Sequence, residues 1–291
     1  MGELLLNVIL PIYLLIGLGF LLGKLNSELR TDTISFIVLY LFAPALIFSS
    51  FRSLEISLSS FSSILVTALG VFGGVYLLSL LVEKSYLGKR NEAFEISAVV
   101  MNAGYLGIPL IYLMFGERAL PFAVTYMVVM AVYHFTLGII ILEGSLKEGL
   151  VSALRIPLIY ALLLSLLLRD VSIPAGIEKI VKLSGDATLP LMLVSIGISL
   201  SRINPSSLRE SLLGTLLRFF GGSFFAFTFA TFLNCPPLLK KVLIVQSSLP
   251  SAILNYVLCE RFGKSPETAA SIIFFSTLLF PLYLLVLRVS L

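Results

Sequence analysis

The sequence is poor in charged side chains. Asp, Glu, Lys and Arg make up 12% of its 291 residues, whereas soluble domains average about 25%. Apolar residues make up 58%, and the mean hydropathy is +1.05. This composition excludes an ordinary soluble domain and indicates a membrane protein. The formal net charge of +4 does not suggest nucleic acid as a partner, because basic residues in loops are expected of any membrane protein.

Histidine and cysteine are also scarce, which excludes most enzyme sites. His134 is the single histidine, so neither the base of a serine protease nor a zinc site with three ligands is expected. An aspartyl protease shares a proton between two aspartates, and Asp186 is the one aspartate expected inside a span. Cys235 and Cys259 make neither a disulfide framework nor a metal site. No enzymatic activity and no cofactor are expected.

The apolar residues occur in long runs that predict an all-α membrane protein with ten transmembrane helices. A bilayer core needs about 20 apolar residues per helix, and the charged residues lie between runs of that length. The first run is expected to remain on the chain and not to be cleaved as a signal peptide. The expected helices cover residues 4–23, 33–51, 60–82, 93–115, 118–142, 152–169, 174–200, 210–233, 241–260 and 266–289.

Prolines recur at a nearly constant spacing, which indicates an internal repeat. The pairs are Pro11 with Pro157 and Pro44 with Pro190 at 146 residues, Pro109 with Pro250 at 141, and Pro121 with Pro266 at 145. Around the first pair, PIYLLIGLGFLLGK resembles PLIYALLLSLLLRD. The pattern predicts two five-helix units, residues 1–145 and 146–291. Five helices per unit bring the second unit in from the opposite side, so the repeats are inverted, as in many transporters.

Two expected helices contain residues that interrupt a helix. In 93–115, Gly104, Gly107 and Pro109 follow Asn102; in 241–260, Pro250 is surrounded by polar residues. Because an unpaired backbone group in lipid costs several kcal/mol, such breaks are expected to be packed in protein or to line a polar cavity. A kinked packing helix is the alternative for the first. Interrupted helices at corresponding places in two halves indicate a transporter binding site, whose free helix N-termini suit an anion.

Several motifs resemble one transporter family. NAGYLGIP, followed by LIYLMFGERAL, is similar to the fourth helix of the auxin efflux carrier family, and SSLPSAILNYVLCERFGKSPETAA is similar to its ninth. LPIYLLIGLGFLLGK, FIVLYLFAPALIFSSF, RIPLIYALLLSLLL and TLPLMLVSIGISLSR resemble the first, second, sixth and seventh. The resemblance covers nearly the whole chain. Plant members carry a long loop between helices 5 and 6, where this chain has only EGSLKEGLVS.

The resemblance implies a fold like that of bile-acid sodium symporters. Helices 1, 2, 6 and 7 would form a scaffold, and helices 3–5 and 8–10 a transport domain. It also implies export of a small organic anion across the cell membrane, an elevator-type motion and a homodimer. Helices 4 and 9 would cross at their breaks beside the substrate. The substrate-binding residues expected from this are Asn102, Gly104, Tyr105, Gly107, Pro109, Gln246, Ser247, Ser248, Pro250, Ser251 and Asn255.

Two other functions stay open. The first is a Na⁺- or H⁺-coupled symporter of the bile-acid type, for which a carboxylate near the crossing would be the distinguishing feature. Glu95 and Glu260 are expected at helix ends instead. The second is a membrane scaffold or sensor that does not transport. At position 255 this chain has asparagine where plant members have a further proline, so the contacts on that side are expected to differ.

Three ionisable residues fall inside expected helices, where a charge is costly and often functional. Asp186 could bind a proton or Na⁺, pair with a basic group, or lie in water at a helix start. Arg218 lies two turns into its helix, so we expect it to extend toward the membrane interface and not to attract an anion. For His134 we expect a buried, hydrogen-bonded imidazole more than a charge switch.

Basic residues are divided unequally between the two faces of the membrane. The positive-inside rule makes the richer face cytoplasmic and puts both termini outside. Eleven follow helices 1, 3, 5, 7 and 9: Lys24, Arg30, Lys84, Lys89, Arg90, Lys147, Arg155, Arg202, Arg209, Arg261 and Lys264. Eight lie on the opposite face: Arg52, Arg118, Arg169, Lys179, Lys182, Lys240, Lys241 and Arg288.

This orientation can be tested by cysteine labelling in a variant that lacks Cys235 and Cys259. We expect a cysteine at Ser145 to react with an impermeant maleimide only from the cytoplasmic side. A cysteine at Ser290 should react only from outside. Labelling of position 145 exclusively from outside would show that the orientation is reversed.

Overall fold

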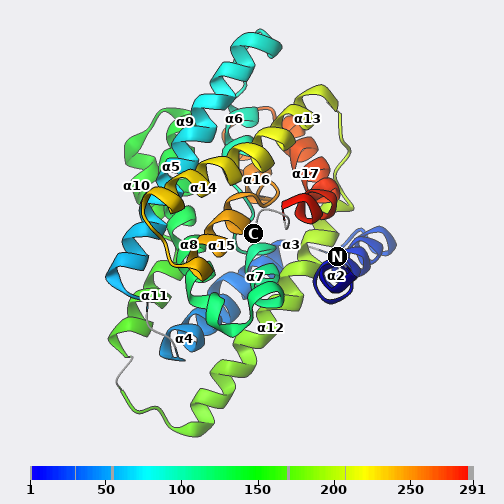
Figure 1. The fold of residues 1–291 in the computed structure, drawn as a ribbon. Coiled ribbons are helices and arrows are strands. Elements are labelled where there is room, and N and C mark those ends of the chain that lie inside the picture. Colours follow the sequence, from blue (N-terminus) through cyan, green and yellow to red (C-terminus); the bar gives the residue numbers. More distant parts are fainter. Residues whose placement is uncertain (1, 30, 54–55, 169–170, 207, 288–291) are drawn as a thin grey trace.

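The computed structural model describes residues 2–29, 31–53, 56–168, 171–206 and 208–287. These residues form helices joined by short loops, and the only strand-like pairing among them is one isolated β-bridge. Figure 1 shows how the helices are arranged. They are α1 (Gly2–Leu4), α2 (Leu10–Leu25), α3 (Thr31–Ile37), α4 (Ala43–Ser53), α5 (Leu58–Val82), α6 (Glu92–Val99), α7 (Gly107–Phe115), α8 (Leu120–Tyr133), α9 (Ile139–Glu143), α10 (Leu146–Ala153), α11 (Pro157–Leu167), α12 (Ala175–Leu200), α13 (Leu208–Leu216), α14 (Gly222–Phe232), α15 (Pro237–Ser247), α16 (Leu254–Arg261) and α17 (Pro266–Leu287).

Turns of wider π-helix or of 3-10 helix join or extend several of these helices. Within the described residues, seven helical segments are long and apolar enough to cross a membrane: Gly2–Leu25, Thr31–Ser50, Leu58–Leu87, Glu117–Glu143, Ala175–Leu200, Leu208–Phe232 and Pro266–Leu287. The pair α10 and α11, bent by 48°, makes an eighth if it is counted as one span. The chain is therefore an all-helical, multi-pass membrane protein.

These segments agree closely with seven of the helices expected from the sequence; residues 288–289 of the last lie outside the described residues. The expected helix 152–169 differs, because the short connection before it folds as α10. The Ser145 hydroxyl caps α10 by accepting a hydrogen bond from the Glu148 N–H at 3.3 Å. Residue 169 also lies outside the description. The expected helices 93–115 and 241–260 are each divided into two short helices, α6 and α7, and α15 and α16.

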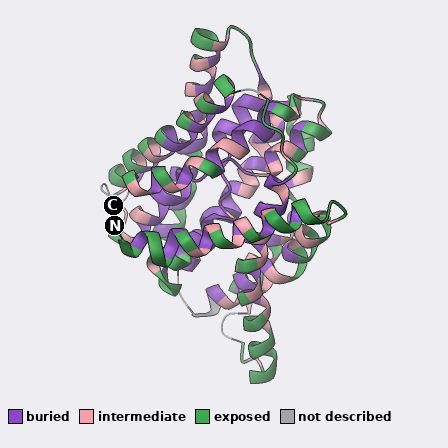
Figure 2. Cartoon of the chain, turned by 90° about the vertical axis from the view of Figure 1, so that its right-hand side faces the viewer, coloured by how far each residue is buried: buried purple, intermediate pink, exposed green. Residues whose placement is uncertain are grey.

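Apolar residues cover both the interior and the surface of the molecule. Figure 2 shows buried residues concentrated at the centre and exposed ones along the outer helices. On α2, Ile12 and Ile16 are buried, whereas Leu14, Leu18 and Leu21 are each more than half exposed. An exposed row of leucines is the expected surface of a helix that faces lipid.

Two glycines bring the backbones of α2 and α12 together. A Cβ atom added to Gly19 would lie 2.9 Å from the carbonyl carbon of Val194. A Cβ added to Gly197 would lie 2.6 Å from the backbone nitrogen of Phe20. Small residues at helix–helix contacts are typical of membrane proteins, since packing drives association in lipid. At these two positions the backbone leaves no space for a side chain.

The contact predicts opposite effects of the same substitution at two glycines of α2. Gly19→Ala should destabilise the protein by about 1–3 kcal/mol, since the added methyl group meets backbone that cannot rotate away. Gly17→Ala has nothing within 4 Å of its new Cβ, and should be neutral or stabilise by up to about 1 kcal/mol through helix propensity. Thermal unfolding in detergent would compare them. Equal melting temperatures for the two variants would contradict the packing.

Candidate functional site

The two interrupted helices meet at their breaks. Helix α6 ends at Val99 and α15 ends at Ser247, and each is followed by non-helical residues before α7 and α16 begin. The Asn102 N–H donates to the Pro250 carbonyl at 2.8 Å, and the Ala252 N–H donates to the Val100 carbonyl at 3.1 Å. Met101 and Ser251 form an antiparallel β-bridge between these two bonds. We call residues 100–106 and 248–253 the crossing.

The bridge supplies partners for backbone groups that the broken helices leave free. Such groups must be satisfied within the protein at membrane depth. On helix α7 the position of the break corrects the expectation from the sequence. Pro109 is the third residue of α7 and does not interrupt it; a proline in a first turn lacks only an N–H that has no helical partner anyway. The helix is interrupted further upstream, at Val100.

Two asparagines stabilise the crossing. Asn255 donates from its side-chain nitrogen to the Val100 carbonyl at 3.0 Å and to the Ser251 hydroxyl at 2.9 Å. It therefore joins the two chain segments directly. The Asn102 side-chain oxygen accepts a hydrogen bond from the Tyr105 N–H at 3.2 Å, which closes the turn that leads into α7.

Other residues expected at the site pack at the end of α15. The hydroxyls of Ser247 and Tyr126 are 2.8 Å apart, and Gln246 donates to the Ala123 carbonyl at 3.4 Å. The Ser248 hydroxyl donates back to α15, to the Val245 carbonyl. Gly107 is close to Gln246 and Leu249, where a Cβ would lie 2.7 Å from Leu249 Cδ1. The structure thus brings all eleven expected residues to the crossing or to the helix ends beside it.

These residues are not equally accessible. Gly104 and Tyr105 are half-buried, whereas the other nine are buried. Tyr105 is hydrogen-bonded through its side chain to Ser35 of α3. The half-buried part of the crossing next to Asn102 therefore lies beside the helical segment that contains α3.

Arg218 occupies the opposite, fully buried side of the crossing. Its guanidinium donates from Nη1 to the carbonyls of Ala98, at 2.7 Å, and Val99, and from Nη2 to the Ser247 carbonyl at 2.6 Å. The side chain has no exposed surface. The expectation that Arg218 extends to the membrane interface is therefore wrong. The carbonyls at the ends of α6 and α15 hold the guanidinium inside. They would have no partner if the side chain extended to the interface.

Gly222 makes room for this arrangement one helical turn further on. A Cβ at Gly222 would lie 2.9 Å from the Ser247 carbonyl carbon and 2.5 Å from Arg218 Nη2. Sequence reasoning missed Arg218 and Tyr126 as parts of the site. The sequence marks Arg218 as unusual, since it is a charge within an apolar segment. Whether its side chain points inward depends on the fold, which places the ends of both α6 and α15 within its reach.

The remaining ionisable residues take different positions. His134 is buried, as expected, and its side chain faces Asn255. Asp186 is exposed on α12, in the wall of a cavity of about 970 Å³ between α4, α11, α12 and the far end of α7. Glu117, Glu178 and Lys182 line the same cavity, but no residue of the crossing does. Cys235 and Cys259 are both free thiols.

Comparison with known proteins assigns the chain to a family. A family model described as membrane transport protein matches it twice, over residues 4–153 and 145–288. The chain belongs to the membrane transport protein family. This confirms the resemblance carried by the sequence motifs. The chain is accordingly classed as a multi-pass membrane transporter.

Two transporters of other organisms are similar to the chain over nearly their whole length. An uncharacterized transporter of Methanothermobacter thermautotrophicus is 27% identical over 289 residues, which cover 94% of each chain. An uncharacterized transporter of Methanocaldococcus jannaschii is 28% identical over 294 residues, covering 93% of this chain and 94% of the relative. Both are described as transporters without a stated substrate.

The three carbonyl contacts of Arg218 predict a large loss of stability when they are removed. Arg218→Met should leave buried carbonyls of α6 and α15 without donors, each at a cost of about 1–3 kcal/mol. Arg209→Met is the matched control, because the exposed Arg209 also donates to a carbonyl, that of Tyr86, at 2.6 Å. We expect that control to change stability by less than about 1 kcal/mol. Thermal unfolding in detergent measures both, and similar losses for the two variants would show that Arg218 does not hold the crossing together.

Proposed function

We propose that this protein is a secondary transporter that exports a small organic anion. One observation carries the proposal: the arginine at the crossing binds the two negative helix ends, and the two positive ends remain. Each helix end is equivalent to about half an elementary charge, negative at the C-terminus and positive at the N-terminus. Arg218 covers the C-terminal ends of α6 and α15. The N-terminal ends of α7 and α16 then favour an anion.

The proposed substrate contacts lie on the accessible side of the crossing. Asn102 uses its side-chain oxygen for the Tyr105 N–H, which leaves its amide nitrogen as a donor for an anion. Gly104 and Tyr105 are half-buried beside it. We propose that the substrate binds here, between the crossing and α3. The other nine residues named from the sequence would shape the site through the hydrogen bonds described above.

The proposed architecture has ten crossings in two inverted repeats, residues 1–145 and 146–291. The half-helix pairs α6–α7 and α15–α16 complete the ten. Helix α12 packs on α2 and α4, and α4 packs on α11; these four, with α3 and α10, would form the scaffold. Helices α5 to α9 and α13 to α17 would form the moving body of an elevator. The cavity of about 970 Å³ that contains Asp186 lies along the boundary between the two groups.

Further parts of the proposal follow from the family resemblance. The protein would act in the cell membrane as a homodimer that associates through the scaffold. Asp186 is proposed as a site where a coupling ion could bind, because it is open to the boundary cavity. No catalytic residue, metal or cofactor enters the proposal.

Substitution of Asn102 tests where the substrate binds. A thermal-shift screen of organic acids on the purified protein would first identify a ligand. We expect Asn102→Ala to weaken its binding by roughly five- to 150-fold, the equivalent of about 1–3 kcal/mol for a lost buried hydrogen bond. Asn102→Asp should weaken it further, since it keeps the oxygen that accepts from Tyr105 but adds a negative charge beside the anion.

Asn26→Asp is the matched control for this experiment. Asn26 is exposed, and its side-chain oxygen likewise closes a turn by accepting from the Glu28 N–H at 2.9 Å. This variant should bind and transport like the wild type. If Asn102→Asp binds the same anion with wild-type affinity and carries it across liposomes, the substrate does not bind at the crossing.

A further inference from the structure

Two buried glutamates meet where α5 leads into α6. Glu83 is 3% exposed and Glu95 is fully buried. Glu83 belongs to the π-helical turn that extends α5, and Glu95 lies in the first turn of α6. Buried carboxyl groups in membrane proteins are rare and are usually functional. Neither residue takes part in the crossing described above.

The contacts of the two carboxyls differ. Glu95 accepts two hydrogen bonds from Arg90, Nε to Oε1 at 2.6 Å and Nη2 to Oε2 at 3.1 Å. Glu83 accepts one from the Asn91 N–H at 2.8 Å. Asn91 brings the two residues together, because its N–H donates to Glu83 and its carbonyl accepts the Glu95 N–H at 3.0 Å. Arg90 and the positive N-terminal end of α6 both favour the ionised form of Glu95.

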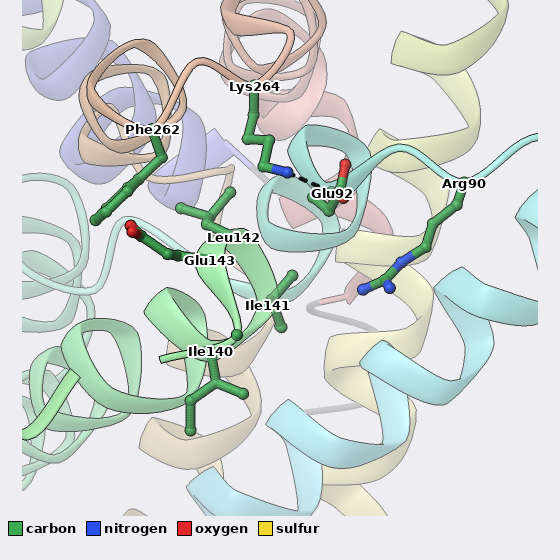
Figure 3. A pocket seen from close by; sticks show the side chains of 9 residues that line it. Arg90, Glu92, Ile140, Ile141, Leu142, Glu143, Phe262 and Lys264 are labelled. Carbon is green, nitrogen blue, oxygen red and sulfur yellow. Dashed lines mark hydrogen bonds and ion pairs between the residues drawn. The ribbon is translucent and has the colours of Figure 1, made fainter. Parts of the chain in front are cut away.

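The neighbouring positive side chains are paired with carboxylates other than Glu83: Lys264 with Glu92, and Arg90 with Glu95. Figure 3 shows Lys264 turned toward Glu92, with which it forms an ion pair of 3.1 Å, and Arg90 on the other side of Glu92. The pocket drawn there has a volume of about 410 Å³. The further polar and charged groups on the packed elements are Tyr76, hydrogen-bonded to Glu95; Arg209, bonded to the Tyr86 carbonyl; Glu210, bonded to Thr268; Glu143 at the end of α9; and Glu267 on α17.

Among the described residues, two buried carboxyls thus face one guanidinium. If both were ionised, two buried negative charges would lie side by side with only one positive charge, on the Arg90 side chain that is 56% exposed. Carboxyl groups so close cannot both ionise readily, and they share a proton.

We propose that Glu83 and Glu95 form a proton-binding site that holds one shared proton. The proton resides on Glu83 and is donated to the carboxylate of Glu95, which Arg90 keeps ionised. Glu83 keeps its proton because the negative charge of Glu95 lies beside it, so removal of Glu95 releases the proton from Glu83. The site lies on the same short helix, α6, whose last carbonyls bind Arg218. This inference goes beyond the proposed function, since it requires no knowledge of the substrate.

Infrared spectroscopy of the purified protein at neutral pH tests the proposal. A protonated carboxyl absorbs apart from carboxylates and amides, and ¹³C-glutamate labelling identifies the glutamate contribution. We expect the wild type to show this band. Glu83→Gln should lose one carboxyl's share of it, while its amide replaces the proton as donor to Glu95. Glu95→Gln should lose the same share, because Glu83 then ionises beside Arg90.

Glu260→Gln is the control, since Glu260 is exposed and accepts only from the Tyr256 hydroxyl at 3.3 Å. It should keep the band. Size-exclusion profiles establish that each variant is folded; if Glu83→Gln does not fold, the Glu95→Gln spectrum decides. The proposal is overturned if the wild type has no protonated glutamate at neutral pH. It is also overturned if the band persists in full in Glu95→Gln, which would mean that Glu83 holds a proton alone.

Discussion

Backbone groups at membrane depth must find partners inside the protein, and this constraint shapes the centre of the molecule. The breaks in two helices leave carbonyls and N–H groups free at the same depth. The β-bridge between Met101 and Ser251 satisfies some of them, and Arg218 satisfies three of the carbonyls. Without these bonds, the ends of α6 and α15 would leave buried backbone groups unpaired. Each unpaired group would cost several kcal/mol.

The contacts of Arg218 also determine the distribution of charge at the crossing. The positive charge of the Arg218 guanidinium is balanced locally by the negative partial charges of the two helix C-termini that it covers. The positive ends of α7 and α16 have no equivalent acidic partner among the hydrogen bonds described. Arg218 therefore meets a structural requirement of the backbone and, in the proposed function, leaves the positive helix ends of the crossing for an anion.

Much of the fold follows from the sequence because hydrophobic length is a strong signal in membrane proteins. The long helices appear close to the expected residues, and Pro121 and Pro266, paired in the sequence repeat, both lie in the first turns of helices. The place where a helix breaks is a weaker signal. Pro109 marked the break but lies inside α7, since proline is well tolerated in a first turn. What interrupts the helix is the pairing of Val100 and Asn102 with a distant segment, which local sequence does not encode.

Side-chain direction was the least predictable feature of the candidate site. The polar residues around Pro250 were identified because they are unusual in an apolar segment. Arg218 was equally unusual, but whether it extends to the interface or inward depends on which acceptors the fold places near it. Glu95 lies at a helix end, as the sequence predicts, but it is fully buried because α5, α9, α13 and α17 pack around α6.

The contact between α2 and α12 has a further consequence, for rates of movement. At Gly19 and Gly197 backbone lies against backbone, so no rotamer change can let one helix slide past the other. Side chains elsewhere can reorient within picoseconds to nanoseconds, and whole bodies move in microseconds to milliseconds. Relative movement is therefore less costly at boundaries filled by flexible side chains, such as the wall of the cavity beside α12, than at the contact between α2 and α12.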